Sequence, residues 1–336
     1  MPDLVSNLAY RLLENPIDPV PRYRILKDVL MWPDEPESIQ LAREQAMSSF
    51  YVRELSQSQA ADGSWGRFYT RNKMVKFAGK TTETALVRSV SLGMDKKHPV
   101  IGRSIKYLES VLLGLASWPD RPEETLEWPV GIKLVTAACL NLLDPENEAS
   151  RPVAALWQGI LQETLADGYF DEVRYQEMFE DYFHQLPNNG SSLARSGYIL
   201  MLLRNRIPYD LEVRLTNHLI NHARGIFLIN NRSLNHFPLE FPSRESLRFL
   251  AALDLLSYFP SASNLLEKAY EWLWDQKNSE GLWDFGQLGR DGLHLPLSNS
   301  WRVLKARETD CTIRILTIMV RMQRSCDLRK TICHEI

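Results

Sequence analysis

The sequence lacks the features of secreted and membrane proteins. Its 336 residues include only four cysteines, Cys139, Cys311, Cys326 and Cys333, which are too few and too scattered for a disulfide framework. No run approaches the ~20 consecutive apolar residues of a membrane span. The segment 1–4 has neither the basic nor the apolar character of a signal region. We therefore expect a cytoplasmic protein with reduced thiols and no transmembrane segment.

Strong charge and common catalytic motifs are absent as well. The formal net charge of −3 provides no basic surface for nucleic acid, so nucleic-acid binding is disfavoured. The sequence contains no Gly-rich phosphate loop, nucleophile elbow or cysteine-rich zinc spacing. Hydrophobic residues make up 44% of the chain, which suffices for a sizeable core. No run has the pattern of a β-strand, and we expect an all-α protein.

The main positive feature is a near-repeat about 218 residues apart. The segment 59–66 reads QAADGSWG and the segment 276–283 reads QKNSEGLW. Both contain Gln, a short spacer, an acid, Gly, any residue and Trp. Weaker copies lie at 151–170 and 103–108. Repeats of this kind are typical of stacked helical architectures.

Each strong copy follows a helix-like apolar stripe. We expect Gly63 and Gly281 to end those helices in the left-handed conformation that glycine adopts easily. Trp65 and Trp283 would then cover the helix ends, and Gln59 would bond to a neighbouring helix end. These residues are therefore predicted to stabilise the fold rather than to catalyse a reaction.

Periodicity and start signals outline the helices. They are predicted over 4–14, 22–31, 38–60, 81–93, 98–116, 130–143, 150–166, 172–185, 191–205, 210–224, 243–258, 261–277 and 308–324. In two of them, Thr82-Glu83 parallels Thr309-Asp310 as a helix start. Long loops are expected at 62–80, 117–129, 225–242 and 278–307. Two of these, 62–80 and 278–307, follow the strong repeats, and we expect them to roof a central cavity.

The repeat resembles the QW motif of squalene-hopene cyclases and related terpenoid cyclases, and protein prenyltransferase β-subunits are similar in fold. The likeness covers roughly residues 40–325. It implies one α/α toroid, a barrel of about six helix pairs, over residues 1–336. Residues 1–37 would form an N-terminal helical extension and residues 325–336 a C-terminal tail.

The same resemblance implies a proton donor. Protonation-initiated cyclases carry an Asp-x-Asp-Asp-Thr motif, and Glu308-Thr309-Asp310-Cys311-Thr312 is similar to it. Asp310 would then be the catalytic acid, with Glu308 and Thr312 setting its hydrogen bonds. Cys311 departs from the third Asp of the pattern. The alternative is that Thr309 and Asp310 only cap a helix.

Terpenoid cyclases line their cavities with aromatic rings, whose faces stabilise carbocations. The resemblance thus implies a hydrophobic small-molecule substrate held by Tyr69, Trp128, Tyr182 and Trp301, although aromatic residues also serve as core. It implies no metal or other cofactor, apart from Mg²⁺ should the substrate be a diphosphate. A partner domain or a homo-oligomer remains open.

Two further clusters share helix faces. One could bind a divalent ion or a magnesium diphosphate, although a solvated acidic face is the preferred explanation: Glu177, Glu180, Asp181 and His184. His218 and His222 form the other, most simply a surface pair. A zinc site at Asp310 and Cys311 is disfavoured, because neighbouring side chains diverge on a helix.

Three functional classes follow. The first is a terpenoid cyclase-like or prenyltransferase-like enzyme that acts on an isoprenoid in a central cavity. The second is a catalytically degenerate toroid that binds a lipid-like ligand or a protein. The third is a carbohydrate-active barrel that uses paired carboxylates, such as Glu83 with Asp310 or Glu177 with Asp181.

Overall fold

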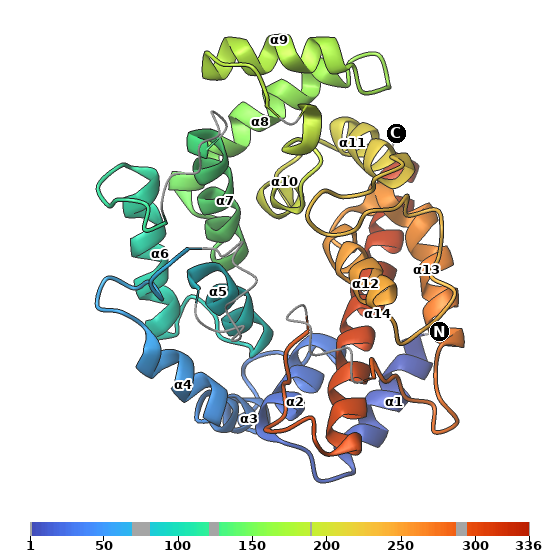
Figure 1. The fold of residues 1–336 in the computed structure, drawn as a ribbon. Helices are drawn as coiled ribbons and strands as arrows, with labels where there is room; N and C mark the ends of the chain where they lie inside the picture. Colours follow the sequence, from blue (N-terminus) through green and yellow to red (C-terminus); the bar gives the residue numbers. More distant parts are fainter. Residues whose placement is uncertain (1, 69–80, 121–127, 189, 287–293, 336) are drawn as a thin grey trace.

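The computed structural model describes residues 2–68, 81–120, 128–188, 190–286 and 294–335 (Figure 1). Within these ranges the chain is helical and contains no β-strand, which confirms the all-α prediction. The α-helices are α1 (Pro2–Leu13), α2 (Pro19–Arg24), α3 (Glu37–Met47), α4 (Phe50–Ser58), α5 (Thr82–Ser91), α6 (Pro99–Leu112), α7 (Trp128–Leu143), α8 (Arg151–Thr164), α9 (Glu172–Phe183), α10 (Gly197–Leu203), α11 (Tyr209–Asn221), α12 (Arg244–Leu256), α13 (Ser263–Asp275) and α14 (Leu304–Glu335). Shorter turns are η1 (Ile25–Val29), η2 (Glu148–Ser150), η3 (Gly190–Ser192) and η4 (Pro260–Ala262).

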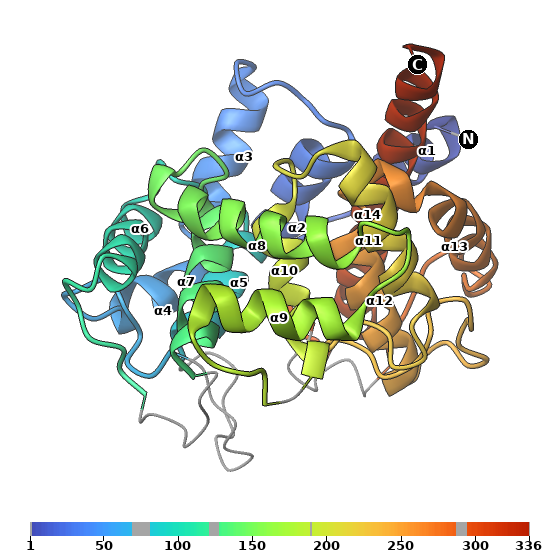
Figure 2. The same cartoon turned by 90° about the horizontal axis from the view of Figure 1, so that it is seen from above.

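The helices follow one another around a ring in Figure 1. Helix α14 contacts α1, α2 and η1, so the two ends of the chain meet and close the ring. Helices α1 and α2 and the turn η1 thus pack directly against the last helix. In Figure 2, α3 and the last turns of α14 extend beyond the other helices at the same end of the ring.

The helix α14 differs most from its prediction. It begins at Leu304 and ends at Glu335, whereas the sequence predicts 308–324. The early start has no Ser, Thr or Asp cap to reveal it, but residues 304–308 are good helix formers. Thr309 and Asp310 consequently lie inside the helix, and the prediction that they cap it is wrong. Residues 325–335 continue the helix instead of forming a separate tail.

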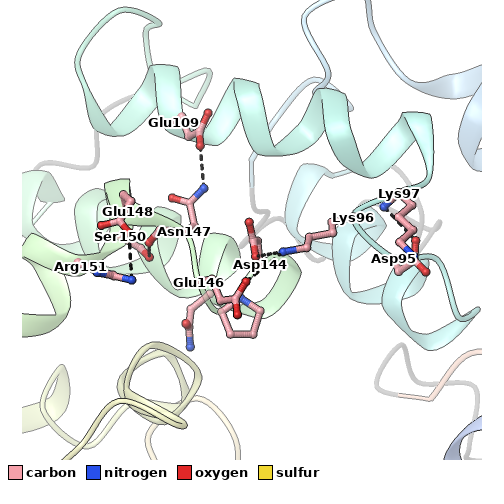
Figure 3. A network of polar contacts seen from close by, with 12 residues as sticks. Asp95, Lys96, Lys97, Glu109, Asp144, Glu146, Asn147, Glu148, Ser150 and Arg151 are labelled. Carbon is pink, nitrogen blue, oxygen red and sulfur yellow. Dashed lines mark hydrogen bonds and ion pairs between the residues drawn. The ribbon is translucent and has the colours of Figure 1, made fainter. Parts of the chain in front are cut away.

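The core lies between the helix layers, and α6 illustrates how the sequence creates it. Pro99 opens this helix, and every third or fourth residue is then buried: Val100, Ile101, Ser104, Tyr107, Leu108 and Val111. Polar contacts join the connecting turns outside this layer (Figure 3). Lys96 donates to Asp144 at 2.9 Å, and Asn147 Nδ2 donates to Glu109 of α6 at 2.7 Å. Successive helix pairs are thus tied together at their ends.

The two strong repeats form the same local structure, which we call the Trp clasp (residues 55–65 and 273–283). The indole N–H of Trp65 donates to Leu55 O at 3.0 Å, and that of Trp283 donates to Leu273 O at 2.7 Å. Each Trp thereby satisfies a carbonyl in the last turn of the helix before it. The prediction that these Trp residues cover helix ends is confirmed.

Gly63 forms a tight turn within the first Trp clasp and does not cap a helix. Helix α4 ends at Ser58, five residues before Gly63. Gly63 has φ of +93° in a tight turn, where its N–H donates to Ala60 O at 3.0 Å. The predicted left-handed conformation is confirmed, while its predicted place at the helix end is wrong. Gln59 donates to Val100 O of α6 at 2.9 Å, as expected for a residue that bonds to a neighbouring helix end.

The clasps also correct the alignment of the repeats. The backbone N–H of Trp65 donates to Thr82 Oγ1 at 3.0 Å, and that of Trp283 donates to Thr312 Oγ1 at 3.1 Å. Thr82 therefore corresponds to Thr312 and not to Thr309. In consequence, Glu83 and Asp310 do not occupy equivalent positions.

Candidate functional site

The helices that face one another across the ring carry ionisable side chains on their facing sides. Glu83 of α5 accepts a hydrogen bond from the hydroxyl of Tyr198 of α10 at 2.5 Å. Arg321 of α14 forms an ion pair with Asp254 of α12 and donates to Tyr258 Oη at 2.6 Å. These contacts join α5 to α10 and α14 to the end of α12, and the ribbons of these four helices border the middle of the ring in Figure 1. We call this set of facing side chains the interior face.

Apolar side chains are part of the interior face. Val87 lies one turn after Glu83 on the same side of α5, and it remains 47% exposed although α5 is flanked by α4, α6 and α7. Met201 of α10 and Leu255 of α12 are half-buried. The interior face thus combines charged groups with aliphatic ones.

Arg88, on the same helix as Glu83, is unusual among the buried residues. Its side chain is 5% exposed, and Nη1 is buried without a partner. Among the described residues, no hydrogen bond or ion pair reaches the guanidinium, which lies over the ring of Tyr51 with 4.6 Å between Cζ and the ring centroid. Burial, followed by the charge of Arg314, lowers the pKa of Arg88 to about 9.

Among the surrounding charges, that of Arg314 on α14 has the largest effect on the pKa of Arg88. Arg314 Nη2 donates to Leu295 O, but its Nε is buried without a partner. Burial lowers the pKa of Arg314, and the nearby charge of Asp310 opposes that shift. Two guanidinium groups with unsatisfied nitrogen atoms therefore influence each other, and no carboxylate of the described segments forms an ion pair with either.

Asp310 is wholly buried and acts as an anchor for the segment before α14. Its Oδ2 accepts hydrogen bonds from Leu297 N at 2.8 Å, from Ser298 N at 2.9 Å and Oγ at 2.8 Å, and from Trp301 Nε1 at 2.5 Å. Its Oδ1 is buried without a partner. Burial raises the pKa of Asp310, while the four hydrogen bonds and Arg314 oppose the increase.

The predicted partners of Asp310 lie elsewhere. Glu308 accepts a hydrogen bond from Asn278 at 2.9 Å, and Thr312 accepts one from Trp283 N. The donors to Asp310 come instead from residues 297–301, which sequence spacing did not identify. Trp301 is 2% exposed, so its predicted role in lining a cavity is replaced by a hydrogen bond to Asp310.

Of the other three predicted aromatic residues, Tyr182 is the one whose side chain the structure describes. Tyr182 is on the outlying helix α9 and is 49% exposed. Tyr69 lies outside the described residues. Trp128 begins α7, but its side chain is outside the described part.

The two remaining clusters are separate from the interior face. Glu177, Glu180 and Asp181 are exposed on α9, and His184 is exposed just after it in the left-handed conformation, so it does not share their helix face as predicted. His218 stacks on Phe170 with ring centroids 4.4 Å apart, and burial lowers its pKa to about 4. Within the described ranges, no group of three or more His, Cys, Asp or Glu side chains is arranged to hold a metal ion. In the same part of the chain, no helix has the length and apolar character needed to cross a membrane.

Glu83 is the carboxyl group of the interior face whose protonation we expect to matter for stability. Burial raises its pKa above the ordinary value of 4.5, although the hydrogen bond from Tyr198 opposes the shift. The folded protein therefore holds this proton more tightly than the unfolded chain. The resulting stabilisation is complete below the ordinary pKa and is lost as the pH rises through the higher pKa of the folded state.

Replacing Glu83 by glutamine should remove this pH dependence, because the amide cannot ionise. We expect the melting temperature of Glu83→Gln to rise relative to wild type as the pH increases from about 4.5 to about 8. Thermal denaturation followed by circular dichroism measures the difference. Glu177→Gln, at an exposed position, is the matched control and should show a constant difference. A constant difference for Glu83→Gln as well would contradict the assignment.

Comparisons of the chain with protein-family models, curated proteins and solved structures give no match.

Proposed function

We propose that the ring is an α/α toroid in which inner and outer helices alternate. The inner helices would be α2 with η1, α5, α7, α10, α12 and α14, and the outer ones α1, α4, α6, α8, α11 and α13. This proposal is supported by the contacts of α5 with α7, of α7 with α10 and of α10 with α12, each of which skips one or more helices in the chain. Helices α3 and α9 would be additions to the outer layer.

The proposed function is that of an enzyme of the terpenoid cyclase or prenyltransferase type, which binds an isoprenoid against the interior face. The supporting observation is the composition of that face, where Glu83 and Arg314 are half-buried beside aliphatic side chains. A degenerate toroid filled by its own core would instead place apolar groups there, because an unpaired buried charge is costly. An isoprenoid with a polar head matches both kinds of side chain.

The geometry favours Glu83 over Asp310 as the group that exchanges a proton with the substrate. Glu83 is half-buried and its pKa is raised by burial, so that its protonated form is favoured more than that of an exposed carboxyl group. Asp310 is covered completely, and one of its oxygens already accepts four hydrogen bonds. Asp310 therefore serves in this proposal as the residue that positions segment 297–301.

Product formation tests this function. Wild type, Glu83→Gln, Asp310→Asn and the control Glu177→Gln are incubated with squalene, farnesyl diphosphate or geranylgeranyl diphosphate, with and without Mg²⁺. The products are identified by mass spectrometry. We expect a new product from the wild type and the control, and a loss of about 100-fold or more in Glu83→Gln.

Asp310→Asn separates the two candidate acids. The variant should retain part of the activity if Asp310 only positions segment 297–301. Complete loss of activity with an unchanged melting temperature would indicate that Asp310 is the proton donor. No product from wild type with any of these substrates would contradict the proposed activity.

A further inference from the structure

Arg88 is a buried cation that forms no ion pair within the part of the chain that the structure describes. Proteins pair their buried charges, because removal of an ion from water is costly unless an opposite charge and hydrogen bonds replace the water. Arg88 has only the face of Tyr51, and its Nη1 is enclosed without an acceptor. A guanidinium offers five N–H donors in a planar fork, which suits the oxygens of a phosphate or carboxylate. The missing partner is thus an oxyanion.

The charges around Arg88 strengthen this requirement. Arg314 lies close enough for its charge to act on Arg88, and its Nε also lacks an acceptor. Asp310 is the nearby buried carboxylate. Its Oδ2 accepts from Leu297, Ser298 and Trp301, its Oδ1 has no partner, and its single negative charge acts on both arginines. One carboxylate does not neutralise two guanidinium groups, and the two like charges repel each other. An anion that binds both would relieve the repulsion and satisfy the free donors.

We infer that Arg88 and Arg314 form a binding site for the phosphate or diphosphate group of the ligand. The inference rests on the proposed function only in placing the organic part of the ligand along the interior face, to which α5 contributes the exposed side chain of Val87. The preferred ligand class is an isoprenoid diphosphate. Two guanidinium groups supply two positive charges, which match the charge of a diphosphate better than that of a carboxylate.

A second basic surface provides the comparison. A depression of about 360 Å³ is lined by Arg232, Arg244, Arg248 and His236, among others. Arg232 is paired with Glu245 at 2.5 Å, and Arg244 and Arg248 are exposed to water. Exposed guanidinium groups do not need an anion to offset burial. This surface is therefore the control and not the proposed site.

Calorimetric titration with inorganic pyrophosphate and orthophosphate tests the site in the full-length protein. The variants are Arg88→Met, Arg314→Met, Arg88→Lys and the control Arg248→Met. We expect pyrophosphate to bind wild type and Arg248→Met equally, and to bind Arg88→Met and Arg314→Met at least tenfold more weakly. Arg88→Lys should fall between, since it keeps the charge but loses the fork. Equal affinity for wild type and Arg88→Met, or no binding to wild type, would overturn the inference.

Thermal denaturation shows whether the variants still fold. Without ligand, Arg88→Met should melt at or above the temperature of wild type, because the substitution removes an unpaired buried charge. Saturating pyrophosphate should raise the melting temperature of wild type and leave that of Arg88→Met unchanged. An equal increase in both would overturn the assignment.

The two proposals can fail separately. Pyrophosphate binding that depends on Arg88, without any isoprenoid product, would retain the anion site and contradict the enzymatic function. Isoprenoid product formation together with pyrophosphate binding that Arg88→Met does not affect would retain the enzymatic function and contradict the anion site.

Discussion

Gly63→Val is expected to destabilise the protein by about 3–5 kcal/mol. Two effects add at this position. The backbone has φ of +93°, which a β-branched residue resists, and a Cβ would lie 2.4 Å from the carbonyl oxygen of Arg103 on α6. The turn of the first Trp clasp would have to move away from α6, and the hydrogen bonds of Gln59 to α6 would be lost with it. Urea denaturation measures the change in the free energy of unfolding.

Gly66→Val is the matched control. Gly66 also has a positive φ of +79°, but nothing lies within 4 Å of its Cβ position. Its substitution should therefore cost only the backbone strain, about 1–2 kcal/mol. Equal destabilisation by the two variants would show that the clasp does not pack closely against α6. A Gly63→Val variant that kept its full melting temperature while losing activity would contradict the structural role of the clasp.

Asp310→Ala should be nearly as damaging, with an expected loss of about 3–5 kcal/mol. The substitution leaves four buried donors without an acceptor: Leu297 N, Ser298 N, Ser298 Oγ and Trp301 Nε1. Segment 297–301 would then separate from α14, and the amides of Leu297 and Ser298 should exchange hydrogen much faster. Asp310→Asn should cost less, because its carbonyl oxygen can still accept from these donors.

The control for Asp310 is Asp284→Ala. Asp284 accepts two hydrogen bonds from Arg307 of α14, each at 2.7 Å, and both side chains are partly exposed. Its loss should cost about 1 kcal/mol and leave exchange at residues 297 and 298 unchanged. Unchanged exchange in Asp310→Ala would contradict the anchoring role.

Local features of the sequence predicted local structure, namely helices and the residues that cap or cover their ends. Apolar periodicity found helices such as α6 and α12, and Thr81 does cap α5 by accepting from Thr84 N at 3.3 Å. The repeated Trp residues predicted cover for helix ends, since a Trp beside a helix end has few other uses in a polar turn. Each of these signals lies within about one helix length of the structure it predicts.

The interior face could not be predicted in this way. Glu83 and Tyr198 are 115 residues apart, and no spacing in the sequence links them. Thr309 resembled Thr82 more closely than Thr312 did, because both are followed by an acidic residue. Similar neighbouring residues do not reveal which hydroxyl accepts from the backbone N–H of the clasp Trp. The described helices packed around Arg88 provide no hydrogen-bond acceptor for its Nη1. This can be seen only in the folded structure, because it depends on all of these helices together.

The central claim is that the interior face binds an anionic isoprenoid, and diffraction from crystals grown with a thio-analogue of farnesyl diphosphate tests it most directly. The account predicts the diphosphate between Arg88 and Arg314, with the hydrocarbon chain beside Val87, Met201 and Leu255. Ligand found only in the surface depression beside Arg244 and Arg248, or an interior filled entirely by the protein's own side chains, would contradict it.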